Sequence, residues 1–239
     1  MFDMSTSMNK KFILYAYPRT GASAIMTALT AAGINHCHVP FWMHQSRNMN
    51  LTTNPHNHIE LSKKLFEKYD GFKIEFKQSL QLKEICDENN AGLVLVRRND
   101  YLATLASQII FGNDPNNLNG KYDKGLSNKS YETWTSTSRK MVYDPNDRRL
   151  GWLSYQIYDL FYGNYLIDNI YPAYSNYVTT VDYENPMHGL NDLEEYFGVK
   201  IPLTLAASRP LSDYFVNHEE FKSDIEARIK NEINGVQHD

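Results

Sequence analysis

The sequence is poor in cysteine and has no long apolar run. Cys37 and Cys86 are the only cysteines among its 239 residues, which excludes a disulfide framework and fits a reducing compartment. No apolar stretch approaches the ~20 residues that a membrane-spanning helix needs. The first residues, MFDMSTSMNKK, lack the apolar core of a signal peptide. We therefore expect a soluble, cytoplasmic protein without a membrane span, in which residues 1–10 form a flexible tail.

Clusters of basic residues are missing as well. Lysine and arginine total 24 against 28 aspartate and glutamate residues, which gives a net charge of −4. A nucleic-acid-binding protein is expected to carry a basic surface, and a protein of the membrane surface a basic run. We therefore expect neither kind of partner. An anionic ligand would have to be bound by a few cations placed close to it.

The sequence does contain an alternation of apolar strands with helices. Its hydrophobic fraction of 42% is sufficient for a substantial core. Short apolar or alternating runs predict strands at residues 12–17, 71–76, 92–96 and 177–183. Helices are expected at residues 21–32, 59–69, 80–88, 101–110, 150–170, 190–197 and 213–233. This order favours a single α/β domain over residues 1–239, with a central parallel β-sheet flanked by helices in three layers.

The loop between the first strand and the first helix is a candidate anion site. It reads Pro18-Arg19-Thr20-Gly21-Ala22-Ser23. The N–H groups at the start of a helix lack partners within the helix and lie at the positive end of its dipole, so they bind phosphate or sulfate. Gly21 lets the backbone approach an anion closely. Thr20 and Ser23 add hydroxyl donors, and Arg19 adds charged ones; the alternative is a plain connecting turn.

A second candidate follows the strand at residues 92–96. Arg97 and Arg98 stand at its carboxyl end, where open α/β sheets bind their ligands. Asp100 is the expected N-cap of the next helix. Ser107 lies two turns into that helix, so an arginine and Ser107 could hold one phosphate together. An arginine pair and a small helix residue are each commonplace. This motif becomes specific only in combination with the loop at residues 18–23.

Together the two motifs resemble those of sulfotransferases that use 3′-phosphoadenosine 5′-phosphosulfate (PAPS). In that family a loop of Pro-Arg/Lys-Ser/Thr-Gly-x-Ser/Thr type binds the 5′-phosphosulfate, and a strand-end Arg with a later Ser binds the 3′-phosphate. The resemblance implies a P-loop NTPase-like fold, PAPS as co-substrate and 3′,5′-ADP as product. The family's commoner spacing in the second motif is one residue shorter. Arg97 and Arg98 therefore both stay open as the ligand of the 3′-phosphate.

Three further segments are similar to the bacterial carbohydrate branch of the family, which includes trehalose sulfotransferases. They are Gly71-Phe72-Lys73-Ile74, Val181-Asp182-Tyr183-Glu184 and residues 209–221. The similarity implies that Lys73 and Glu75 contact the acceptor, a carbohydrate or small molecule with a hydroxyl group, and that residues 209–221 lie near the donor. The implied donor-binding residues are Arg19, Thr20, Gly21, Ala22, Ser23, Ala24, Arg97, Arg98, Ser107, Arg209 and Ser212.

The implied reaction is an in-line sulfuryl transfer, in which positioning and charge stabilisation dominate. Arg19 is the candidate for stabilising the charge that develops on the transferring group, in an electrostatic role only, because arginine does not release its proton near neutral pH. The bacterial branch has a glutamate base shortly after the first helix, where this chain has Asn35-His36-Cys37-His38. His36 and His38 are therefore candidate bases. Glu60 and Glu75 are the fallback candidates.

Three alternatives compete with this interpretation. The pairs His36/His38 and His56/His58 are of a kind that can chelate zinc, but no third ligand follows at motif spacing, so we expect no metal. A nucleotide kinase-like phosphotransferase would share the architecture, but the lysine that follows the loop glycine in ATP-binding loops is absent. A non-catalytic module that binds 3′,5′-ADP would account for the missing glutamate.

Overall fold

The structure, a computed structural model, describes residues 10–38, 58–76, 81–113, 142–146, 153–204 and 210–235. The chain groups into two compact units. Unit 1 comprises Met1–Asn99 and Gly163–Ala206, and unit 2 comprises Asp100–Tyr162 and Ala207–Asp239. The interpretation of the chain as one functional domain stays a prediction. The expected tail lies, except for its last residue, outside the described residues.

Unit 1 is built on a parallel five-stranded sheet with the strand order β2-β3-β1-β4-β5. The strands are β1 (Phe12–Ala16), β2 (His36–Cys37), β3 (Gly71–Glu75), β4 (Gly92–Arg97) and β5 (Tyr177–Asp182). The four predicted strands are confirmed, and β2 is a further, short strand. β1 is the central strand, and all of its residues are buried. A parallel sheet buried on both faces explains why its strands read as apolar runs.

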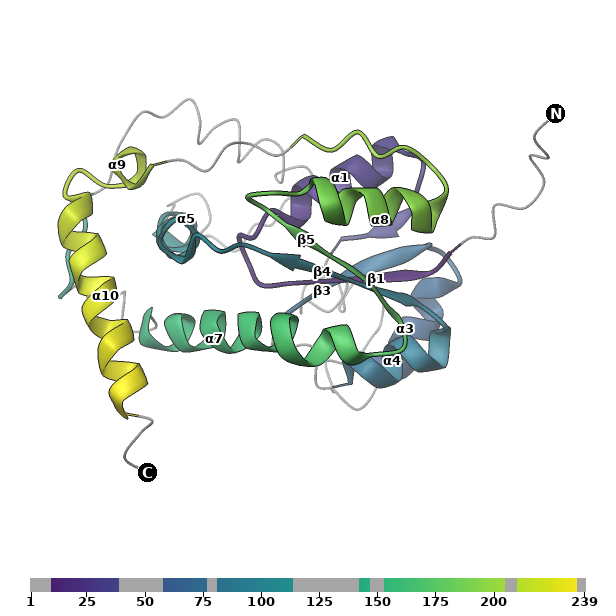
Figure 1. The fold of residues 1–239 in the computed structure, drawn as a ribbon, viewed down its shortest axis with the longest axis horizontal. Coiled ribbons are helices and arrows are strands. Elements are labelled where there is room, and N and C mark those ends of the chain that lie inside the picture. Colours follow the sequence, from purple (N-terminus) through teal and green to yellow (C-terminus); the bar gives the residue numbers. More distant parts are fainter. Residues whose placement is uncertain are drawn as a thin grey trace. The chain divides into compact units, whose positions relative to one another are not determined.

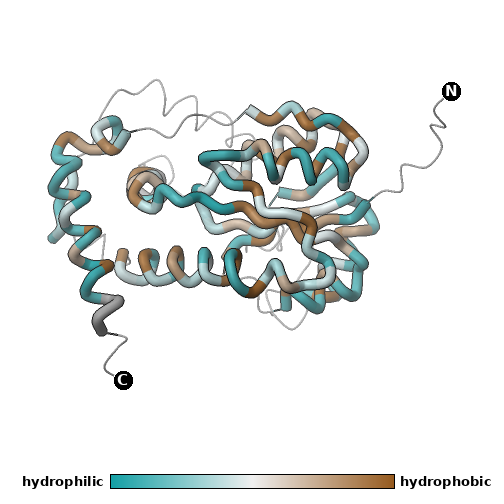
Figure 2. The backbone as a smooth tube through the Cα atoms, viewed as in Figure 1, coloured by the Kyte–Doolittle hydropathy of each residue, from teal (hydrophilic) through white to brown (hydrophobic). Residues whose placement is uncertain are grey.

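Helices cover both faces of this sheet (Figure 1). Those of unit 1 are α1 (Ala22–Ala31), α3 (His58–Phe66), α4 (Leu82–Asn89) and α8 (Met187–Phe197), with the short turns η3 (Leu166–Ile170) and η4 (Tyr171–Ala173). Phe12 and Leu14 of β1 face α1 and α8, whereas Ile13 and Tyr15 face α3, α4 and the two short turns. The sheet accordingly forms an apolar centre between amphipathic helices (Figure 2). This is the three-layer α/β arrangement that the sequence predicted.

The chain changes direction at the centre of the sheet. After β1 it continues into α1 on one face, and after β3 it continues into α4 on the other. β1 and β3 are adjacent, with Phe12 level with Gly71 and Ala16 level with Glu75. Their carboxyl ends therefore flank a topological switch point, where open α/β sheets bind ligands.

Unit 2 is mostly helical in its described part. It contains α5 (Tyr101–Asn113), most of α7 (Leu153–Tyr165), α9 (Leu211–Tyr214) and α10 (His218–Gly235). The Asp100 carboxylate accepts the N–H of Ala103 at 2.9 Å, so its predicted role as the N-cap of α5 is confirmed. None of the described helices is both long and apolar enough to cross a membrane.

The predicted C-terminal helical region, residues 213–233, is confirmed except at residues 215–217, and the final helix begins at His218 rather than at Ser212-Asp213. Phe215 is extended, with φ −126° and ψ 141°, and separates α9 from α10. Its buried ring packs on the rings of Tyr143 and Phe221, at centroid distances of 5.7 and 4.6 Å. Asn217 then accepts the N–H of Tyr143 and donates to its carbonyl, each at 2.7 Å. These contacts with a distant segment require a break that helical periodicity does not reveal.

Gly189 makes the close packing of α8 on β5 possible. A Cβ atom at this position would lie 2.4 Å from the carbonyl oxygen of Thr180. Alanine is favoured over glycine inside a helix by about 1 kcal/mol, but overlap with backbone atoms cannot be relieved by a side-chain rotation. We expect Gly189→Ala to lower the free energy of unfolding by about 1–3 kcal/mol, as measured by chemical denaturation.

Asn191→Ala is the control for this prediction. Asn191 lies on the exposed side of the same helix, so alanine there should be neutral or slightly stabilising through its helix propensity. A Gly189→Ala variant as stable as Asn191→Ala would contradict the close approach of α8 to β5.

Candidate functional site

The loop between β1 and α1 has a strained backbone. Arg19 and Gly21 have positive φ angles of 68° and 89°, while that of Thr20 between them is not positive. Glycine adopts a positive φ readily, but an arginine does so rarely. Alternation of this kind turns successive N–H groups to one side and forms a concavity suited to anions. The buried Thr20 hydroxyl donates to the Tyr17 carbonyl at 2.7 Å and is therefore used by the loop itself.

The first turn of α1 continues this loop. Its start at Gly21 has no side-chain cap, and no acidic residue lies in its first turn. The carbonyl of Gly21 accepts the N–H groups of Ala24 and Ile25, at 2.9 and 3.3 Å. The N–H groups of Ala22 and Ser23 precede these and lie at the positive end of the helix dipole. We refer to residues 18–24 as the donor loop.

The two arginines at the end of β4 have different surroundings. Arg97 donates to Asp182 at 2.6 Å and to Asp168 at 2.5 Å, and these carboxylates raise its pKa. Arg98 is buried, and its Nη1 donates to the carbonyl of Arg19 in the donor loop at 3.2 Å. Side chains alternate along an extended chain, so the two arginines point to different sides. Arg97 joins an ion-pair cluster with Asp168 and Asp182, and Arg98 reaches the donor loop.

The segment after β5 supports Arg98. The Arg98 guanidinium lies over the ring of Tyr183, 4.5 Å from its centroid. Glu184 accepts the N–H of Asn99 with both carboxylate oxygens at 3.1 Å. It therefore holds the chain as it leaves β4.

Four polar side chains meet on the α1 side of the sheet. Lys73 and Glu75 of β3 form an ion pair of 2.7 Å, and their side chains are only 7% and 14% exposed. His38 follows β2, which pairs with β3, and its Nε2 lies 3.4 Å from Ser23 Oγ in the donor loop. Burial, followed by the charges of Lys73 and His36, lowers the pKa of His38 to about 4. His38 is thus a neutral imidazole at pH 7, next to the donor loop.

His36 has a structural role in this arrangement. Its Nε2 lies 2.6 Å from the carbonyl of Met26 and 2.7 Å from Thr30 Oγ1. A carbonyl only accepts, so Nε2 carries the proton. Burial also lowers the pKa of His36, against the effect of its hydrogen bond to Met26. Of the two candidate bases, His38 is the one in contact with the donor loop.

Several predicted residues belong to unit 2, have other partners or fall outside the described residues. Ser107 is buried on α5 and Ser212 is half-buried on α9, and both belong to unit 2. Glu60 is exposed on α3 and pairs with Lys63 at 3.4 Å. Arg209 and His56 lie outside the described residues. Within the part of the chain that the structure describes, no group of three or more His, Cys, Asp or Glu residues could hold a metal ion.

Sequence reasoning missed two contacts of the site. It assigned no role to Tyr183, and it did not pair Ser23 with His38. The available signal was positional, because the carboxyl ends of parallel strands meet at one edge of the sheet and each of these residues lies just beyond such an end. Which side chains touch there depends on the strand order, which the sequence alone does not determine.

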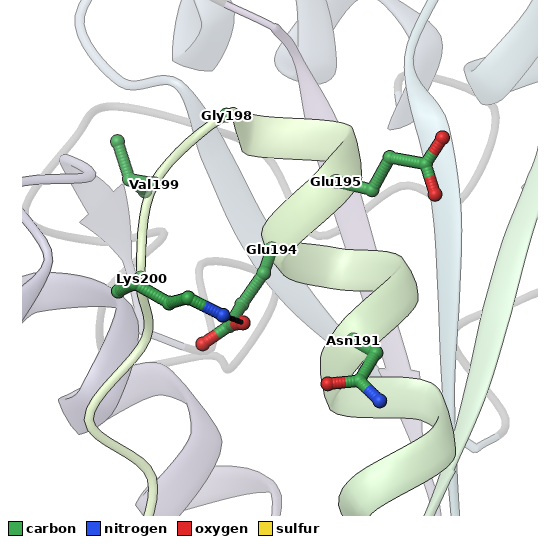
Figure 3. A pocket seen from close by; sticks show the side chains of 6 residues that line it. All are labelled: Asn191, Glu194, Glu195, Gly198, Val199 and Lys200. Atoms are coloured by element: carbon green, nitrogen blue, oxygen red, sulfur yellow. Dashed lines mark hydrogen bonds and ion pairs between the residues drawn. The ribbon is translucent and has the colours of Figure 1, made fainter.

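A separate hollow of about 360 Å³ lies at the C-terminal end of α8 (Figure 3). It is lined by Asn191, Glu194, Glu195, Gly198, Val199 and Lys200. Glu194 accepts from Lys200 at 2.5 Å and from the N–H of Ile201 at 3.0 Å. These groups satisfy one another and close the end of the helix, and none of them belongs to the donor loop or the His38 cluster. The candidate functional site is therefore that cluster and not this hollow.

No protein-family model matches the chain, and no curated protein matches it either.

The lowered pKa of His38 makes stability depend on pH in a defined window. Above pH 6.5 the imidazole is neutral in both the folded and the unfolded chain. Between pH 6.5 and about 4, the unfolded chain takes up a proton that the folded chain does not, so acidification favours unfolding. The contribution is at most about 1.4 kcal/mol per pH unit. His38→Asn lacks this titrating group. We therefore expect the free energy of unfolding of the variant to rise relative to that of the wild type as the pH falls.

Denaturant unfolding of both proteins from pH 7 to pH 4 measures this effect. The difference between their unfolding free energies removes the contributions of the other titrating groups. Parallel curves would show that the folded protein does not hold His38 neutral.

Proposed function

We propose that the protein is a PAPS-dependent sulfotransferase that transfers a sulfuryl group to an acceptor hydroxyl. The position of Arg98 against the donor loop carries the proposal. With Arg98 in this position, two neighbouring anion sites lie at the carboxyl ends of β1 and β4, which are adjacent strands. One site is formed by backbone N–H groups at the positive end of a helix, and the other by a guanidinium. PAPS carries anionic groups at both its 5′ and its 3′ positions and fits such a pair.

In this proposal the donor loop binds the 5′-phosphosulfate through the N–H groups of residues 21–23 and the Ser23 hydroxyl, because the Ala24 N–H already donates to the Gly21 carbonyl. Arg98 binds the 3′-phosphate. Ser107, Arg209 and Ser212, which belong to unit 2, stay predictions of the family resemblance, as does the P-loop NTPase-like form of the fold. Arg97 keeps its two carboxylate partners and is not a ligand.

The chemical step uses the cluster beside the loop. The acceptor oxygen attacks sulfur, the acceptor proton passes to His38, and the bond from sulfur to the 5′-phosphate oxygen breaks to release 3′,5′-ADP. Arg19 stabilises negative charge on the transferring group. A neutral His38 can accept a proton, and the negative charge of a bound donor raises its pKa toward the range of an effective base. Lys73 and Glu75 contact the acceptor, a carbohydrate or another small hydroxyl compound.

The cluster favours this proposal over the two alternatives. A module that only binds 3′,5′-ADP has no use for an imidazole in contact with the donor loop and a nearly buried ion pair beside it. A kinase-like transfer from ATP is expected to use a lysine after the loop glycine, and Ala22 stands there.

Binding of two nucleotides tests the proposal. We expect the protein to bind 3′,5′-ADP about 30- to 1,000-fold more tightly than 5′-AMP, because a charged phosphate contact contributes about 2–4 kcal/mol. Arg98→Gln should reduce this preference strongly, since it removes the cation that meets the 3′-phosphate. Isothermal titration calorimetry of the full chain measures both affinities.

Arg97→Gln is the matched control, one residue away. It should keep the preference for 3′,5′-ADP, although it leaves Asp168 and Asp182 without their partner. Equal affinities of the wild type for the two nucleotides would refute the donor assignment. Loss of the preference in Arg97→Gln alone would move the 3′-phosphate to Arg97.

A further inference from the structure

The ring of Tyr183 packs directly on the donor loop. A Cβ atom at Gly21 would lie 2.4 Å from Cδ2 and 2.8 Å from Cε2 of Tyr183. The ring therefore occupies the space that a side chain at position 21 would need. The backbone N–H of Tyr183 donates to the carbonyl of Arg97 at 2.8 Å. Tyr183 is thereby held between the end of β4 and the loop that follows β1.

The same ring also carries the Arg98 guanidinium, 4.5 Å from its centroid. Arg98 is 5% exposed, and its attraction to the ring is stronger there than at an exposed site because water does not compete. Nη1 of Arg98 donates to the carbonyl of Arg19 at 3.2 Å. One aromatic ring thus contacts both the glycine of the donor loop and the arginine beside it.

We infer that Tyr183 is a positioning residue for the donor: its ring fixes the Arg98 guanidinium next to the donor loop and couples the two anion sites. The inference rests on the proposed function. An arginine side chain loses several rotatable bonds when it binds a ligand, and prearrangement removes much of that cost. Because the ring also abuts Gly21, a shift of the loop displaces the surface on which Arg98 rests. Tyr183 therefore affects affinity for the 3′-phosphate without touching it.

The alternative is that Tyr183 only fills space. Tyr183→Phe keeps the ring and removes the hydroxyl, while Tyr183→Leu keeps an apolar side chain and removes the ring. If Tyr183 only fills space, Tyr183→Leu should weaken the binding of both nucleotides to the same extent. If Tyr183 positions Arg98, Tyr183→Leu should weaken the binding of 3′,5′-ADP selectively, because only this nucleotide has the phosphate that Arg98 binds.

The test is calorimetric titration of the full-length wild type, Tyr183→Phe and Tyr183→Leu with 3′,5′-ADP and with 5′-AMP. We expect Tyr183→Phe to keep the wild-type preference within about twofold. Tyr183→Leu should lose about tenfold of it, the range of a desolvated cation–π contact, with little change for 5′-AMP. An unchanged preference in Tyr183→Leu, or an equal loss for both nucleotides, would overturn the inference alone. A wild type without any preference would overturn the proposed function, and this inference with it.

Two glycines supply an independent check if Tyr183→Leu is poorly folded. Gly21→Ala introduces a Cβ that pushes the ring aside, and it also strains a residue at φ 89°. Gly33→Ala imposes similar strain at φ 84° with nothing within 4 Å of the added Cβ. We expect Gly21→Ala to lose the nucleotide preference and Gly33→Ala to keep it. Retention of the preference in Gly21→Ala would contradict the role of the ring.

Discussion

The first turn of α1 presents backbone N–H groups beside the carboxyl end of the central strand, and no side chain caps them. A helix that begins in this way needs partners for these groups, and an anion is the partner that its dipole favours. The loop that precedes α1 has a conformation that leaves these N–H groups uncapped. The left-handed residues Arg19 and Gly21 shape the turn of the loop, and the buried hydroxyl of Thr20 holds that turn. The remaining cations of the site are arranged around this helix end.

Alternation along the strands decides which side chains join the site. It divides Arg97 from Arg98, so that one is held by Asp168 and Asp182 while the other rests on the donor loop. On the other side of β1, it turns His36 and His38 toward α1, where they contact Met26 and Ser23. A neutral imidazole, which follows β2, and a cation, which follows β4, therefore approach the same loop from opposite sides of the central strand. Such a separation suits a transfer reaction, in which the donor's anionic groups and the acceptor's proton need different partners.

Much of this fold could be predicted from the sequence, because apolar runs and helical periodicity are local signals. The strands around Phe12 and Gly92 and the Asp100 cap are examples. The donor loop could be located as well, since it follows directly from strand, turn and helix. The partners of its residues could not, because Tyr183 and Arg98 lie far from Gly21 along the chain and meet it only through the strand order. The break at Phe215 was missed for the same reason, as its cause is the distant Tyr143.

A transfer assay with sulfur-labelled PAPS tests whether this cluster performs sulfuryl transfer. The full chain is incubated with the donor and a panel of sugars and small alcohols, without added Mg²⁺, and labelled product and 3′,5′-ADP are quantified. We expect equal amounts of both products. We also expect Arg19→Ala to slow turnover by about 100-fold or more while 3′,5′-ADP still binds, because the lost contact is made mainly in the transition state. Absence of labelled product with every acceptor, together with phosphoryl transfer from ATP when Mg²⁺ is added, would contradict it.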